Sequence, residues 1–421
     1  MTCRAVSRDL AKLLLVDDVE LRSGSRLISF LSWVSRDLLH RAPFVRGLII
    51  FICPPLYSEA EGEMLTYFFV FLRSVLTLRC LTLQDAEATL ELHPNLVAAI
   101  AELTTIIDLA LIDAGPRSCW LLRSTSSRLE YVNITIRDNG DDWEMNQDTH
   151  LAYSLATHTS SLGELRTISI WNLVAPGCPQ YPNLRHLSVG EMELPIIEDY
   201  VHAFPNLQSL EVFEEEEEDC VYGWDDELTV ITRHRERNIE ARRHIGTWMQ
   251  LRAFDGFFCA LYAFGLTFHI PELCLTNMHH GLDLVALCTA LEDGQPTMLE
   301  LSISEVKWFL HPEFVSLMSG VNTVRDLGIN LQPAPEEPKE EMEFDLESIL
   351  VRVPRLLMIY WGWPCSSVIE QDTIVHILAT LDCVESFLIM VDFYIPDLDG
   401  RSKNLEPRLV VHLGSQGEGM M

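Results

Sequence analysis

Two segments of the chain share one pattern, Tyr181-Pro-Asn-Leu-Arg-His-Leu-Ser-Val189 and Phe204-Pro-Asn-Leu-Gln-Ser-Leu-Glu-Val212. The two copies begin 23 residues apart. Each copy ends in alternating apolar residues, a pattern typical of a half-buried β-strand. Between the strands, residues 194–204 carry apolar side chains at helical spacing after Pro195, a residue suited to the first turn of a helix. One repeat is therefore predicted to be a short strand, a turn and a helix.

A repeat of this length is typical of leucine-rich repeats. The frame Leu-x-x-Leu-x-Leu, with other large apolar residues allowed, recurs along nearly the whole chain at irregular intervals of 19 to 44 residues. The fourteen matches are 16–21, 45–50, 78–83, 106–111, 129–134, 165–170, 184–189, 207–212, 251–256, 270–275, 298–303, 324–329, 353–358 and 384–389. We expect an α/β fold, an irregular leucine-rich-repeat solenoid with a curved parallel sheet and helices on the convex side. A non-repetitive α/β fold also alternates strands and helices, and is the alternative.

Composition limits the class of function. The formal charge of −32 repels phosphate backbones, so we expect no nucleic-acid partner. No apolar stretch is long enough to cross a bilayer, so we expect no membrane partner. The N-terminus carries no secretion signal, so we do not expect secretion. The eleven cysteines show no paired spacing. A reduced compartment, cytoplasmic or nuclear, fits this cysteine usage.

Acidic residues are concentrated in two segments that we expect to be insertions in the solenoid. Residues 214–219 form an unbroken run of acids, and residues 333–345 mix proline with glutamate. The predicted organisation is an N-terminal cap at 1–15, a solenoid at 16–413 with acidic insertions at about 213–245 and 331–347, and a disordered tail at 414–421. Each acidic segment is interpreted as a solvated loop, or alternatively as a patch that recruits a basic partner.

The N-terminal part of the chain carries a family resemblance. Val6-Ser7-Arg8 and Leu10-Ala11 lie in a helical pattern that leads directly into the first strand frame. With Leu21-Arg-Ser-Gly-Ser-Arg-Leu and Phe44-Val-Arg-Gly-Leu48, this arrangement resembles the fungal family of F-box/leucine-rich-repeat-like proteins. The resemblance implies the substrate receptor of a cullin-type ubiquitin ligase, with a ligase adaptor as partner. The Leu-Pro-x-Glu opening of an F-box is not present before Cys3, so residues 1–15 would correspond to a remnant of the last F-box helix.

Motifs that carry chemistry are missing from the sequence. It contains no HExxH metal helix, no GxSxG nucleophile elbow and no GxxxxGK[ST] phosphate loop. We therefore expect no catalytic residue, no cofactor and no metal. The leading hypothesis is a non-enzymatic protein-interaction module. A solenoid scaffold unrelated to ubiquitination and an enzyme on an α/β fold are the alternatives.

The repeat frame also predicts which residues face a partner. The third and fifth positions, and the one after the last Leu, point away from the core because strand side chains alternate. Exposed aromatic residues are common anchors of protein interfaces. The predicted concave binding surface for a protein partner comprises Tyr131, Asn133, Ser169, Trp171, His186, Glu211 and Phe213, with Tyr360, Trp361 and Trp363 farther along. Alternatively, Trp171 or Trp361 packs under a loop.

Overall fold

The computed structural model divides the chain into two compact units. The first comprises Met1–Glu193, Glu198–Gln208 and Thr247–Gln250, and the second comprises Leu194–Ile197, Ser209–Gly246 and Leu251–Met421. The structure describes residues 15, 18–51, 59–136, 150–168, 173–174, 176–190, 194–213, 224–278, 284–303, 323–324, 326–331, 356–364, 386–396, 402–404 and 410–414.

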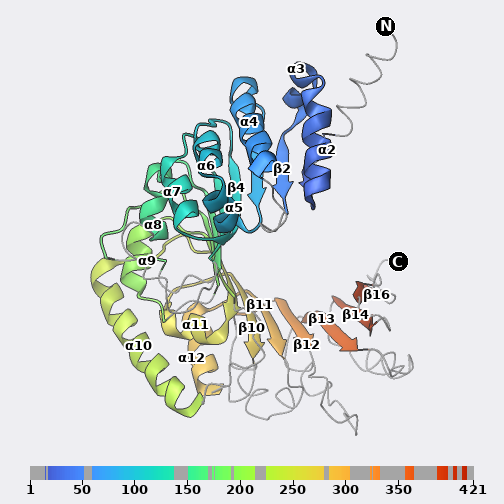
Figure 1. The fold of residues 1–421 in the computed structure, drawn as a ribbon. Helices are drawn as coiled ribbons and strands as arrows, with labels where there is room; N and C mark the ends of the chain where they lie inside the picture. The colour runs from blue at the N-terminus through green and yellow to red at the C-terminus, as the bar shows by residue number, and fades with distance from the viewer. Residues whose placement is uncertain are drawn as a thin grey trace, which may run out of the picture. The chain divides into compact units, whose positions relative to one another are not determined.

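Seven strands of the first unit form a parallel sheet in sequence order (Figure 1). They are β1 (Val19–Leu21), β2 (Gly47–Ile50), β3 (Cys80–Leu83), β4 (Asp108–Ala114), β5 (Tyr131–Ile136), β6 (Glu164–Ile168) and β7 (His186–Gly190). Each strand pairs in parallel with the next. The prediction of an α/β fold with neighbouring parallel strands is confirmed here.

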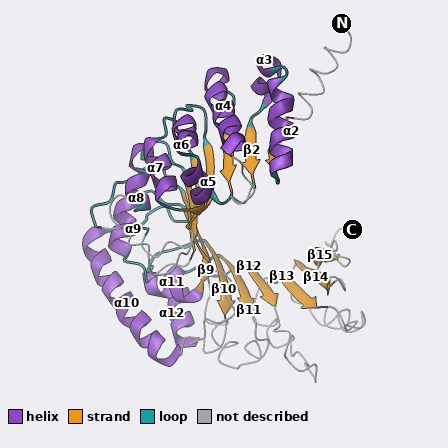
Figure 2. Cartoon of the chain, in the orientation of Figure 1, coloured by secondary structure: helices purple, strands orange, loops and turns teal. Residues whose placement is uncertain are grey.

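Helices lie between most of the successive strands of the first unit, and one more follows β7 (Figure 2). They are α2 (Gly24–Ser35), α3 (Leu38–Arg41), η1 (Ala42–Phe44), α4 (Glu59–Val75), α5 (Ala86–Leu92), α6 (Pro94–Ala101), α7 (Pro116–Ser124), α8 (Leu151–Ser154), η4 (Ala156–His158) and α9 (Ile197–Ala203), which lies in this unit except for its first residue. The start of α2 shows why the local sequence folds this way. The Ser23 hydroxyl accepts a hydrogen bond from the amide of Arg26 at 3.4 Å, which caps the helix. Leu27 and Leu31, one turn apart, are both buried.

The core of the first unit lies between the sheet and these helices. Each strand contributes two inward side chains separated by one outward residue, as strand geometry requires. In β3 these are Leu81 and Leu83, and in β5 they are Val132 and Ile134, all at most 1% exposed. Full burial of one such side chain stabilises the fold by about 1.5–3 kcal/mol. The repeated frame therefore builds one continuous core from a short strand per repeat.

The position of β6 corrects one predicted frame. We expected Leu165, Ile168 and Ile170 to fill the core, but Glu164 pairs with Tyr131 and with His186. That register places the frame three residues earlier, at Leu162, Leu165 and Thr167, which are at most 1% exposed, while Ile168 is half-buried. The backbone fixes this register, because the amides of Gly163 and Glu164 both donate to the carbonyl oxygen of Glu130, at 2.9 and 3.1 Å.

The second unit also contains a parallel sheet. Its strands β8 (Ser209–Phe213), β9 (Ala253–Phe257), β10 (Glu272–Met278), β11 (Met298–Ile303), β12 (Asp326–Leu331), β13 (Leu356–Pro364) and β14 (Ser386–Pro396) pair in parallel in this order. Two further strands, β15 (Ser402–Asn404) and β16 (Val410–Gly414), pair antiparallel to β14. The repeat frame did not predict this antiparallel ending.

A second frame is corrected at β11. We expected Met298, Leu301 and Ile303 in the core, but Met298 pairs with Glu272 and is 43% exposed. Leu299 and Leu301 are the buried pair. The frame therefore begins at Pro296, two residues earlier, and this proline is itself buried.

Among the described residues of the second unit there are three helices: α10 (Trp224–Ile245), α11 (Phe258–Phe264) and α12 (Leu284–Gly294). In Figure 1, α11 and α12 lie on one side of β9–β11. The helix α10 occupies residues 224–245 of the segment 213–245 that we expected to be an acidic insertion, and it contains five arginines. Across the described part of the chain, no helix is both long and apolar enough to span a bilayer.

Other predicted segments lie outside the described residues. These are residues 1–14 of the expected N-terminal cap, 332–347 of the second acidic insertion and 415–421 of the tail. Leu15, the last residue of the expected cap, is buried.

Candidate binding surfaces on the strand faces

In the first unit, three neighbouring strands align six outward residues, which we call the β5–β7 face. It consists of Tyr131, Asn133, Glu164, Arg166, His186 and Ser188, aligned in two rows by the strand pairing. The residues between these rows, Val132, Leu165 and Leu187, are buried on the opposite side of the sheet. The structure thus places three of the predicted residues, Tyr131, Asn133 and His186, on one face. Glu164 and Arg166 were missed because the frame of β6 was assigned three residues too late.

Asn133 has an unusual place on the β5–β7 face. Its side-chain oxygen is buried and finds no hydrogen-bond partner among the described residues. An unsatisfied buried acceptor costs about 1–3 kcal/mol, which a donor supplied by a bound molecule would offset. This oxygen is therefore a candidate acceptor for a partner's N–H or O–H group.

Two carboxylates, Asp18 and Asp108, lie at the outward side of β1–β4. The Asp18 carboxylate lies directly over Gly47, where an added Cβ would be 1.6 Å from its Oδ1 atom. Burial, together with the charges of Asp18 and Glu164, raises the pKa of Asp108. Glycine at position 47 leaves the space in which this carboxylate lies.

The second unit presents a different surface, which we call the β8–β11 face. It consists of Glu211, Phe213, Asp255, Phe257, Cys274 and Glu300. The pairs Glu211–Asp255, Asp255–Cys274 and Cys274–Glu300 are register partners, so four of these side chains lie in one row across four strands. The preceding residues Leu210, Phe254, Leu273 and Leu299 are each at most 1% exposed and fill the core. Glu211 and Phe213 were predicted, whereas the other four occupy outward positions of later strands that the sequence analysis did not select.

Two groups in the row on the β8–β11 face have raised pKa values. Burial raises the pKa of Asp255, and the charge of Glu211 raises it further, while a hydrogen bond with Cys274 opposes both effects. Burial and the neighbouring charges of Asp255 and Glu300 raise the pKa of the Cys274 thiol. The thiol therefore stays protonated at neutral pH and is a poor nucleophile.

Five of the predicted binding residues lie elsewhere in the chain. Ser169 and Trp171 lie outside the described residues. Tyr360, Trp361 and Trp363 lie in β13, where the backbone alone is described; Tyr360 pairs with Asn330 and Met390.

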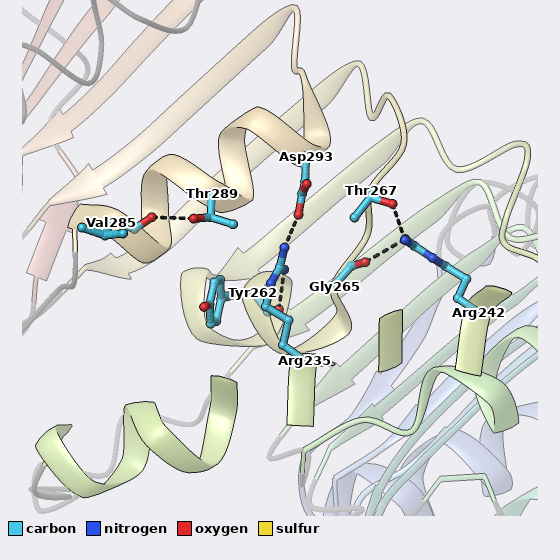
Figure 3. Close-up of polar contacts among 8 residues, drawn as sticks. All are labelled: Arg235, Arg242, Tyr262, Gly265, Thr267, Val285, Thr289 and Asp293. Atoms are coloured by element: carbon cyan, nitrogen blue, oxygen red, sulfur yellow. Dashed lines mark hydrogen bonds and ion pairs between the residues drawn. The ribbon is translucent and has the colours of Figure 1, made fainter. Parts of the chain in front are cut away.

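A buried polar network fixes the helical layer of the second unit (Figure 3). Arg235 of α10 donates to the carbonyl oxygen of Tyr262 at 2.9 Å, pairs with the carboxylate of Asp293, and lies over the Tyr262 ring at 4.5 Å. Arg242 donates to the carbonyl oxygen of Gly265 at 2.7 Å and to the hydroxyl of Thr267.

Asn238, between these arginines on α10, completes the network. Its amide nitrogen donates to the carbonyl oxygens of Ala263 at 2.9 Å and Pro195 at 2.8 Å, and its oxygen accepts from the amide of Ile197 at 3.2 Å. These side chains together satisfy carbonyls at the C-terminal end of α11, where cations are favoured. The network therefore has a structural role, because these side-chain groups already make hydrogen bonds within the protein.

Buried titratable groups in the first unit are also poor candidates for chemistry. Burial raises the pKa of the Cys119 thiol to about 11, so this thiol is uncharged at neutral pH. Burial lowers the pKa of His150 and of His158. Over the residues that the structure describes, no group of three or more His, Cys, Asp or Glu side chains could hold a metal ion.

Comparison of the chain with protein-family models and with curated proteins gave no match.

Proposed function

We propose that this chain is a non-enzymatic protein-interaction module that binds a protein partner through the outward faces of its strands. The observation that carries the proposal is the alternation of burial along successive strands, seen at Tyr131, Val132, Asn133 and Ile134. It leaves a row of polar and aromatic side chains on the side of each sheet opposite its helices. Repeat proteins generally bind partners on such extended surfaces.

The raised pKa values of two thiols support an interaction module over an enzyme with a catalytic cysteine. Cys119 and Cys274 both have a raised pKa, whereas a catalytic thiolate needs a lowered one. The carboxylates with raised pKa, Asp108 and Asp255, lie on strand faces, and the thiol beside Asp255, Cys274, has a raised pKa and is a poor nucleophile. An enzyme on this α/β fold is the alternative, and turnover that survives substitution of both outward faces would favour it.

Partner capture by the purified chain tests the proposal. Substituting Tyr131 and His186 together by alanine, or Phe213 alone, should weaken capture by more than about tenfold if these side chains are anchors. Trp171→Ala belongs in the same series because the sequence places it among the outward residues. The matched control is Trp120→Ala, an aromatic residue that is 49% exposed on α7 in the helical layer. Equal capture by the control and by all the face variants would contradict the proposal.

A role as substrate receptor of a ubiquitin ligase is the finer proposal, and it rests on the sequence resemblance. We expect a 421-residue chain of this sequence to bind a ligase adaptor poorly, because only residues 3–15 match the adaptor-binding helices of that family. A pull-down with purified adaptor tests this expectation. Tight adaptor binding would favour the ligase receptor, and its absence combined with partner capture would favour a scaffold unrelated to ubiquitination. Deletion of residues 1–15 should lower stability without changing adaptor binding, because it removes the buried Leu15.

A further inference from the structure

The loops that lead into β2 and β3 lie side by side at the end of the first sheet where these strands begin. The amide of Arg79 donates to the carbonyl oxygen of Arg46 at 2.7 Å. Close to this bond, the Thr77 hydroxyl donates to the carbonyl oxygen of Ala42 at 3.2 Å, and η1 contacts α4. These contacts join the loops of two neighbouring repeats into one continuous rim.

This rim consists of residues 36–46 and 73–79, and we call it the β2–β3 rim. It contains five arginines and one aspartate, whereas the whole chain has a formal charge of −32. Arg36, Arg46 and Arg79 are exposed, and among the described residues their guanidinium groups make no hydrogen bond or ion pair. The rim is therefore a local reversal of the charge of the chain.

Two carboxylates at the rim already have partners. Asp37 pairs with the ring of His40 at 2.7 Å, and Glu102 of the neighbouring repeat pairs with Arg73 at 2.5 Å. The three exposed arginines are therefore available to an anion that comes from outside the described part of the chain.

Two leucines of the β2–β3 rim are exposed as well. Leu39 of α3 is 76% exposed, and Leu76, directly after α4, is 55% exposed. The backbone of Leu76 has a φ of +56°, a left-handed conformation that glycine adopts without strain and leucine does not. Most of its side chain contributes nothing to the core, so the strained leucine presents apolar surface that a partner could cover.

An acidic protein segment fits both features of the rim. Arginine pairs with carboxylates through two parallel hydrogen bonds, and apolar side chains beside the carboxylates would cover the leucines. A nucleic acid also presents anions, but the formal charge of the whole chain repels its phosphate backbone.

We propose that the β2–β3 rim binds an acidic segment of a protein partner. Its carboxylates pair with Arg36, Arg46 and Arg79, and its apolar side chains pack on Leu39 and Leu76. The segment gains the attraction of these arginines without breaking an ion pair of the described chain. This inference goes beyond the proposed function, which concerns the outward faces of the strands.

Fluorescence anisotropy with a labelled synthetic peptide and the full chain tests this inference. The probe is a peptide of about ten residues with three glutamates and two leucines, which spans roughly 30 Å when extended. The same peptide with lysine in place of glutamate is the negative probe. The variant Arg46→Gln with Arg79→Gln should bind the glutamate peptide about tenfold more weakly, as expected for the loss of two charge-assisted contacts.

The charge control must separate a local site from the net charge of the chain. Arg233→Gln with Arg237→Gln removes the same two charges from exposed positions on α10. This control should bind the glutamate peptide within about twofold of the parent, because salt screens charges that are distant from the peptide.

Leu76→Gly separates binding from folding. Glycine adopts the left-handed backbone freely, so the urea midpoint of unfolding should not fall, whereas the glutamate peptide should bind at least about threefold more weakly. Leu92→Ala on α5 is the control, because Leu92 is also 55% exposed but lies outside the rim, and it should leave peptide binding unchanged.

Four results would overturn the inference: equal loss of peptide binding in both arginine double variants, no loss in either, equal binding of the lysine peptide, or tighter binding of a single-stranded DNA of about ten nucleotides. The strand faces are tested separately. Tyr131→Ala with His186→Ala should leave binding of the glutamate peptide unchanged, because both residues lie on the β5–β7 face. Loss of partner capture in that variant bears on the proposed function alone.

Discussion

Arg235 forms an ion pair with Asp293 at a place where a lone carboxylate would be disfavoured. Asp293 lies in the last turn of α12, and the negative end of a helix repels an anion. The arginine also donates a hydrogen bond to the carbonyl oxygen of Tyr262, near the C-terminal end of α11. One cation therefore contacts the C-terminal ends of two helices. Its side chain is 7% exposed and that of Asp293 is 24% exposed, so solvent screens the pair weakly.

Replacing Arg235 should therefore destabilise the second unit. Arg235→Ala leaves Asp293 without its partner and should cost about 3–5 kcal/mol. Arg243→Ala on the same helix is the control, because its pair with Glu240 is well exposed and contributes ~0–1 kcal/mol. Chemical denaturation of both variants measures the difference. Equal losses would show that the buried pair is not a principal constraint on α10.

Gly256 should tolerate no larger residue. It occupies the inward frame position of β9 with a φ of +143°, and an added Cβ would lie 2.0 Å from the carbonyl oxygen of Val212 on the neighbouring strand. Gly256→Ala should cost roughly 2–5 kcal/mol, from backbone strain plus displacement of the strand.

Gly246→Ala is the control for Gly256, because Gly246 has a φ of +95° but nothing within 4 Å of the added Cβ. The control should lose only ~1–2 kcal/mol, the cost of the left-handed backbone. Thermal unfolding of the two variants separates backbone strain from steric clash. A loss no larger for Gly256→Ala than for the control would contradict the close approach of these strands.

Glu87 should stabilise a helix in the repeat that follows its own. Its buried carboxylate accepts from the amides of Arg117 at 2.7 Å and Ser118 at 3.1 Å, and from the Ser118 hydroxyl at 3.0 Å. Glu87→Gln keeps the shape but replaces one acceptor by a donor, and should cost roughly 1–2 kcal/mol. Glu91→Gln, an exposed change on the same helix, should have almost no effect. Amide hydrogen exchange of α7 would detect the difference; unchanged protection in Glu87→Gln would refute the cap.

Stability of the first unit should fall as the pH falls below 6.5. Burial lowers the folded-state pKa of His150 below its ordinary value of 6.5, and neither ring nitrogen has a hydrogen-bond partner among the described residues. The unfolded chain then binds more protons than the folded chain below pH 6.5. The free energy of unfolding should therefore rise with pH and level off above that value.

Urea unfolding at several pH values tests the His150 contribution. His150→Phe keeps a ring against Tyr153 and should reduce the pH dependence below pH 6.5, and His158, whose pKa burial also lowers, accounts for the part that remains. If the free energy of unfolding depended on pH equally in the parent and in His150→Phe, His150 would not be the source of that dependence. The raised pKa of Asp108 makes the free energy of unfolding fall, rather than rise, as the pH increases through the range where this carboxyl titrates. The measurements should therefore stay above that pH range.

The strands were predictable where both inward residues are large and apolar. In β5 only one assignment of the repeat frame is possible, with Leu129, Val132 and Ile134 as the inward residues. The structure buries these three residues as predicted. In β6, Leu165 fits the first or the fourth position of the frame, and the polar Thr167 occupies a core position where the pattern required an apolar residue. In β11 a buried proline takes the first position, which the pattern also excluded.

The helix α10 was not predictable from its own segment. Its buried positions include Ile231, Arg235 and Asn238, which have helical spacing but mostly polar side chains. Their burial depends on carbonyl groups of α11, supplied by residues more than 20 positions later in the chain. Local hydrophobicity cannot reveal such a partner, so a charged stretch was interpreted as solvated. The outward residues Asp255 and Glu300 could have been found by applying the frame to every strand, once the alignment of β11 was corrected.

The contact made by Glu87 couples the unfolding of two neighbouring repeats. Loss of α5 would deprive α7 of the acceptor for its first amides, and loss of α7 would leave the buried Glu87 carboxylate without these donors. In a one-dimensional array, such a contact energy is lost whichever of the two helices opens first, so it opposes fraying from either direction by the same amount. A protease cut in α5 or in α7 would therefore weaken the other helix.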